Sequence, residues 1–142
     1  MNESDIDTIE KLVGLPLPEE YINLLLEYPE ALSSMKCDGM CAATGELFNK
    51  ANRILRENKF VRSSKFNTED AYGDLHPWKN HFLVIGDSGG GDYYAINLKN
   101  KKVVVYFWDH GTSKLEKHAS SLEQHIKKIF DLYFELAVDG LF

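Results

Sequence analysis

The run from Leu83 to Leu98 constrains the fold most, because a glycine loop joins two apolar segments within sixteen residues. Its first residues are all apolar, which predicts a buried strand, whereas Tyr94, Ile96 and Leu98 alternate and predict a strand with one buried face. Gly89 to Gly91, between the two segments, can adopt positive φ or let another backbone segment approach closely. The run therefore predicts a strand, a specific turn and a second strand.

Length and charge limit the class of protein. A chain of 142 residues matches one domain, and 44% hydrophobic with 27% charged residues is the globular range. The formal charge of −6 would repel a phosphate backbone unless basic residues gathered on one face. The densest basic cluster, at 99–102, is interpreted as a solvated hairpin tip, so we expect no segregated basic face and no nucleic-acid partner.

The N-terminus is acidic where a secretory signal would be basic, and no apolar run approaches the roughly 18 residues of a membrane span. We therefore expect a cytoplasmic protein without membrane contact. Cys37 and Cys41 leave three alternatives open, namely reduced thiols, a disulfide or metal ligation, although no nearby histidine completes a zinc site.

Apolar residues at helical spacing predict helices near both ends of the chain. The predicted helices are 5–13, 18–28, a third that begins at Thr44 and continues through Leu55, and 121–137. The last is capped by Ser120 with Glu123, buries a stripe that includes Phe134 and Ala137, and places His125 on its polar face.

Strands are predicted in the middle of the chain. The central ones are 82–86, 92–98 and 103–109, and 60–66 is a possible edge strand. Residues 29–43 predict only a loop or a short irregular strand, and 67–77 a polar surface loop. Helices at the ends and strands in the middle favour a single α+β domain over 1–142, with a mainly antiparallel sheet covered by the N-terminal helices and the long C-terminal helix.

The glycine loop carries groups with possible chemistry. Asp87-Ser88-Gly89-Gly90 is similar to the nucleophile motif of trypsin-like proteases, but the chain is too short for that fold and lacks its upstream histidine motif. A phosphate cradle is disfavoured because the loop leads into a strand and no lysine follows it. Asp87 and Asp92 can act as an acid and base pair, bind a hard cation or form Asx turns, and the last reading is favoured. We expect no catalytic residue, no metal and no cofactor.

Aromatic residues near the sheet are either core or a binding surface. Tyr93 and Trp108 alternate away from the faces of Tyr94 and Phe107, so these four side chains cannot all point into one core.

Three segments occur in a fixed order: 9–14 followed by Leu-Pro-Glu-Glu-Tyr at 17–21, the strand-loop-strand with Ile85-Gly86 and Gly91-Asp92-Tyr93-Tyr94, and Val103-Val104-Val105 before a closing helix. Together they resemble the SUKH superfamily, which includes yeast cell-wall synthesis regulators and many bacterial immunity proteins. The resemblance runs from about residue 6 to 136. Residues 27–30 depart from the usual Asn-Gly or Asp-Gly turn, and 29–66 match no family pattern.

The resemblance implies a non-catalytic binding domain that neutralises a cognate toxin, often a nuclease or deaminase, by direct contact. The alternatives are a regulatory interaction module without a toxin and, less favoured, a small enzyme or ligand binder. An acidic domain can steer toward a basic nuclease surface. The residues expected to bind the partner are Asp87, Asp92, Tyr93, Trp108 and Asp109.

Overall fold

The computed structural model describes residues 1–35, 42–66 and 68–138, with the backbone alone for 136–138. The alternatives for Cys37 and Cys41, and the predicted burial of Ala137, therefore lie outside the described residues. The helices in the described part are α1 (Glu3–Val13), α2 (Glu19–Leu26), α3 (Glu30–Ser34), α4 (Ala43–Glu46), α5 (Ala51–Val61) and α6 (Leu122–Val138). The strands are β1 (Phe82–Asp87), β2 (Tyr93–Asn97), β3 (Val105–Asp109) and β4 (Lys114–Ala119).

The four strands form one antiparallel sheet in the order β1-β2-β3-β4. Helices precede and follow it, which confirms the α+β prediction. Strand β4 was not predicted, because five of its six side chains are exposed or only half-buried and no apolar alternation marks it. Such polar sequences are common where a strand pairs on one side only.

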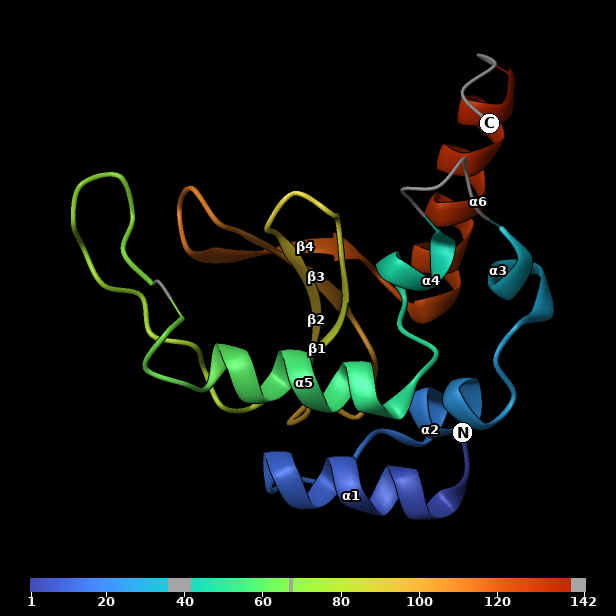
Figure 1. Cartoon of the computed structure of the whole chain (residues 1–142), viewed down its shortest axis with the longest axis horizontal. Helices are drawn as coiled ribbons and strands as arrows, with labels where there is room; N and C mark the ends of the chain where they lie inside the picture. Colours follow the sequence, from blue (N-terminus) through green and yellow to red (C-terminus); the bar gives the residue numbers. More distant parts are fainter. Residues whose placement is uncertain (36–41, 67, 139–142) are drawn as a thin grey trace.

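Helix α5 lies along β1, and α1 packs against α5 from the far side (Figure 1). The buried Asn58 of α5 joins helix to sheet, since its side chain accepts from the N–H of Val84 and donates to its carbonyl, both at 2.9 Å. These two bonds satisfy the Val84 N–H and carbonyl, which lie on the outer edge of β1. The N-terminal helices thus cover the sheet edge through α5.

The predicted single helix from Thr44 to Leu55 is wrong, since the chain is extended between α4 and α5. The Phe48 N–H donates to the Ile85 carbonyl at 2.8 Å, so this connection runs against β1. A Cβ on Gly86 would lie 2.1 Å from the Glu46 carbonyl oxygen, which explains the glycine. Tertiary backbone contact has overridden the helical periodicity.

Two neighbouring predictions are also wrong. Residues 60–66 form the end of α5 and a turn rather than an edge strand, because Val61 is buried on the helical stripe of Ile54. Within 29–43, the five residues of α3 are helical and bury Leu32. The predicted surface loop at 67–77 is confirmed for 68–77.

Helix α6 packs against β4 and α4. Its cap lies one residue beyond the prediction, because Ser121 Oγ accepts the N–H of Gln124 at 3.0 Å.

Two burial predictions for α6 are wrong. His125 was expected on the polar face but is only 1% exposed, whereas Phe134, expected in the apolar stripe, is 69% exposed. No helix in the described ranges combines the length and apolar character needed to cross a bilayer.

Candidate functional site

The three predicted acidic residues lie at one end of the sheet. Asp87 ends β1 and pairs with Tyr93 at the start of β2, which in turn pairs with Trp108 near the end of β3. The loop 88–92 and the turn 110–113 therefore leave the sheet side by side. We call these two loops, together with Asp87 and Asp109, the sheet-end surface.

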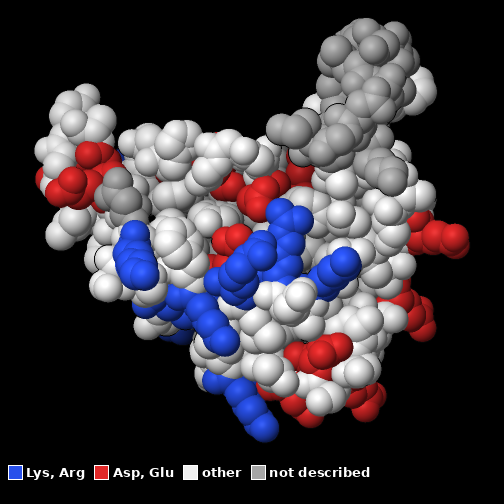
Figure 2. Space-filling model, in the orientation of Figure 1, with Lys and Arg blue, Asp and Glu red and all other residues white. Residues whose placement is uncertain are grey.

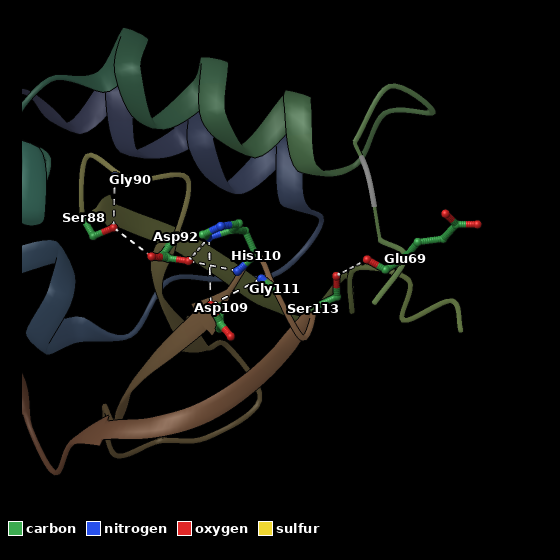
Figure 3. A network of polar contacts seen from close by, with 8 residues as sticks. All are labelled: Glu69, Ser88, Gly90, Asp92, Asp109, His110, Gly111 and Ser113. Atoms are coloured by element: carbon green, nitrogen blue, oxygen red, sulfur yellow. Dashed lines mark hydrogen bonds and ion pairs between the residues drawn. The ribbon is translucent and has the colours of Figure 1, made fainter. Parts of the chain in front are cut away.

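Left-handed glycines and side-chain bonds shape the loop 88–92. Gly89 and Gly91 have φ of 83° and 93°. Ser88 Oγ donates to Asp92 Oδ2 and accepts from the Gly90 N–H, each at 3.3 Å (Figure 3). The Ser88 hydroxyl is therefore part of the turn, and no histidine or lysine in the described part of the chain lies in hydrogen-bond contact to activate it.

Asp92 and His110 form the tightest polar contact of this surface (Figure 3). The Asp92 Oδ1 atom lies 2.6 Å from His110 Nδ1 and accepts the His110 N–H at 2.9 Å. Burial opposes ionisation of Asp92, but the bonds from His110 outweigh it and lower the pKa of this carboxyl. The same bond to Asp92 raises the pKa of His110. The contact thus links the two loops, and it is a mutually stabilised ion pair when His110 is protonated.

Asp109 adds a second carboxylate 3.9 Å from His110 Nδ1, and its side chain is 43% exposed. One ligand atom from each of Asp92, Asp109 and His110 lies within 4.8 Å of the others, which is a spacing that a metal site can use. Nδ1 is engaged with Asp92, however, so it would have to give up that bond to bind an ion. The geometry describes a histidine–carboxylate contact, with the more accessible carboxylate of Asp109 beside it.

Asp87 ties the sheet-end surface to α5. Its Oδ2 atom lies 3.0 Å from Nη2 of Arg53, whose guanidinium stacks over the Phe48 ring at 4.5 Å. The side chain of Asp87 is 21% exposed, so it meets solvent less than Asp109 does. Of the three predicted carboxylates, Asp109 is the most accessible to a partner.

Tyr93 and Trp108 belong to an aromatic cluster on the sheet face opposite Tyr94 and Phe107. Trp108 packs against Phe66 with ring centroids 4.9 Å apart, and against Tyr93 at 5.8 Å. It is only 4% exposed, so it supports the surface from beneath. Tyr93 is half-buried, and its hydroxyl contacts Glu57 of α5 at 3.3 Å. Burial raises the pKa of Tyr93, and its role in binding stays a prediction.

A band of positive charge along α5 adjoins this surface and was missed from the sequence (Figure 2). Residues 50–65 hold six Lys and Arg and one Glu, a formal charge of +5 in a chain of −6. The band consists of Lys50, Arg53, Arg56, Lys59, Arg62 and Lys65. The expectation that basic residues are not segregated is therefore wrong. The three-residue spacing in the sequence is the signal that would have found the band, since it keeps successive residues on neighbouring positions of a helix.

A second group of titratable residues lies between α4, β2 and α6. Burial, followed by the charge of Asp87, raises the pKa of Glu46 to about 7. Burial lowers the pKa of His125 to about 4, and its Nε2 lies 2.9 Å from the Glu46 carbonyl oxygen. The His125 ring contacts Tyr94 with centroids 4.7 Å apart. These positions looked unremarkable in sequence because their burial depends on packing between distant elements.

The fold and the sheet-end surface define an α+β domain that presents paired charges of both signs on one side. The SUKH_6 family model, described as SMI1-KNR4 cell-wall, matches residues 3–126. The chain therefore belongs to this family, which confirms the predicted SUKH resemblance. Members of the family are generally immunity or regulatory proteins without enzymatic activity. No curated protein and no solved structure matches this chain.

Proposed function

We propose that this protein is a cytoplasmic immunity protein that neutralises a cognate toxin, of nuclease type, by direct contact through the sheet-end surface. Membership of the SUKH_6 family carries the proposal. The formal charge of −6 supports a basic partner, because complementary charge accelerates encounter. The ordered loops support it further, since a surface held by internal bonds loses little entropy on binding.

The charges at this surface suggest how a partner would be oriented. Asp109 offers negative potential at the turn after β3, while Arg56 and Lys59 of α5 are exposed. A toxin surface with the opposite arrangement would be attracted in one orientation and repelled in others. This bipolar pattern favours a specific protein over a phosphate backbone, which is negative along its length.

The family description, SMI1-KNR4 cell-wall, favours a second candidate, a regulatory interaction module without a toxin. The neighbouring gene distinguishes the two. Its product, if a toxin, should arrest growth when expressed alone, and co-expression of this chain should restore growth. Purified proteins should then form a stable complex in gel filtration. Toxicity without rescue or complex formation would contradict the immunity proposal.

Asp109→Lys tests the surface within that complex. We expect slower association and a weaker salt dependence, because the change removes an exposed charge that attracts the toxin. Asp131→Lys on α6 makes the same charge change at a side chain that is 61% exposed and serves as the control. Equal association rates for the two variants would exclude the sheet-end surface as the steering site.

A further inference from the structure

The loop 68–76 carries the most exposed large apolar side chain among the described residues. Tyr72 is 91% exposed and Leu75 is 67% exposed. The loop projects away from the sheet and helices in Figure 1. Single exposed apolar residues are common, but two of this size at one projecting tip are typical of a contact site.

Asp70 holds this loop in one conformation. Its Oδ1 atom accepts the N–H groups of Tyr72 at 2.9 Å and Asp74 at 3.0 Å, and its Oδ2 atom lies 2.9 Å from His76 Nε2. Two backbone bonds also cross the loop, from Asp70 to Asp74 and from His76 to Thr68, each at 2.9 Å. Tyr72 and Leu75 are therefore presented on an ordered turn, so that binding need not order the backbone first.

The base of the loop is joined to the sheet-end surface. Ser113, in the turn between β3 and β4, is buried and donates its hydroxyl to the Glu69 carbonyl at 3.3 Å (Figure 3). Its own N–H donates to the Asp109 carbonyl at 2.7 Å. Ser113 has a left-handed φ of 56°, which costs energy for a residue other than glycine. The loop is thus an extension of the sheet-end surface.

Negative charge surrounds the apolar tip. Glu69 and Asp74 are exposed, whereas the Asp70 carboxylate is engaged with His76 and the loop backbone, and 66–78 contain no Lys or Arg. Figure 2 shows acidic side chains gathered at the projecting end of the molecule, above the first blue side chains of the basic band. A complementary partner would offer an apolar pocket surrounded by positive charge.

We propose that the loop 68–76 anchors the complex by inserting Tyr72 and Leu75 into an apolar pocket with a basic rim on the toxin. The inference rests on the proposed immunity function and names the contact that holds the complex together. A tyrosine is suited to this role because it buries a large area at low conformational cost. Asp109 would then govern encounter, and the loop would govern dissociation.

The test measures binding kinetics with the purified toxin domain encoded beside this gene. The double variant Tyr72→Ala/Leu75→Ala should raise the dissociation rate at least about 30-fold, while the association rate changes less than about threefold. Phe134→Ala is the matched control, because it removes a comparably exposed aromatic from α6 and should leave both rates unchanged. Both variants should keep the wild-type melting temperature, since the deleted side chains are exposed.

The outcomes distinguish a failure of this inference from a failure of the proposed immunity function. If the toxin binds the wild type and the double variant with equal dissociation rates, the loop is not the anchor and the immunity function stands. If the toxin does not bind the wild type, the proposed function fails and the inference fails with it. If sedimentation shows that the wild type self-associates through Tyr72 and that toxin binding is insensitive to it, the occupant is a second copy and the proposal is overturned.

Discussion

Glu46 and His125 should impose opposite pH dependences on stability. The Glu46 Oε2 atom is buried and has no hydrogen-bond partner among the described residues. Its pKa rises from 4.5 to about 7 on folding, so its contribution to stability is fully present below pH 4.5 and is lost as the pH rises to 7. This difference corresponds to at most about 3 kcal/mol, and partial solvation of the side chain reduces it to about 2 kcal/mol.

His125 acts in the other direction because its pKa falls from 6.5 to about 4 on folding. Its contribution is fully present above pH 6.5 and is lost as the pH falls to 4, by roughly 3 kcal/mol. Over most of the range between pH 4.5 and 6.5 the two contributions offset each other. A single substitution at either position should therefore reveal the dependence that the other residue imposes.

The assay is urea unfolding of the wild type, Glu46→Gln and His125→Gln between pH 4.5 and 7.5. Relative to the wild type, Glu46→Gln should gain about 2 kcal/mol of unfolding free energy between pH 4.5 and 7.5. His125→Gln retains a donor toward the Glu46 carbonyl. Its unfolding free energy relative to the wild type should fall over the same pH range. The exposed Glu123→Gln serves as the control. A difference between Glu46→Gln and the wild type that stays constant with pH would refute the reasoning.

Three further predictions concern the packing at Gly86, the hydrogen bonds of Asn58 and the hydroxyl of Ser88. Gly86→Ala should destabilise the fold by about 3 kcal/mol in the same urea assay, because the new Cβ would lie 2.1 Å from a backbone oxygen. Gly90→Ala is the control and should cost less than about 1 kcal/mol, because the nearest described atom would lie 3.8 Å from its Cβ. Asn58→Ala should cost roughly 3 kcal/mol, since it leaves the buried N–H and carbonyl of Val84 without partners; an unchanged denaturation midpoint would contradict this. Ser88→Ala should keep wild-type protection against the toxin, because its hydroxyl makes only two 3.3 Å contacts; loss of protection with intact binding and stability would indicate catalysis.

The sequence was sufficient to predict the structure of segments whose conformation depends on their own residues. Helix α1 ends at Gly14, whose φ of 75° only glycine adopts without strain, and the alternation in β2 and β3 placed Tyr93 and Trp108 on the face opposite Tyr94. The clustering of Asp87, Asp92 and Asp109 at one end of the sheet also followed from strand order, because antiparallel neighbours joined by short loops bring alternate strand ends together.

The sequence by itself therefore determined the α+β class, the central strands and the end of the sheet where the acidic residues lie, since these depend on periodicity and turn chemistry within short segments. Only the tertiary structure decided that the backbone of β1 interrupts the helix after Glu46 and that His125 is buried. It also decided that Trp108 is covered while Tyr72 is exposed. Burial and contact at these positions are set by residues far away in the chain, and no local pattern contains that information.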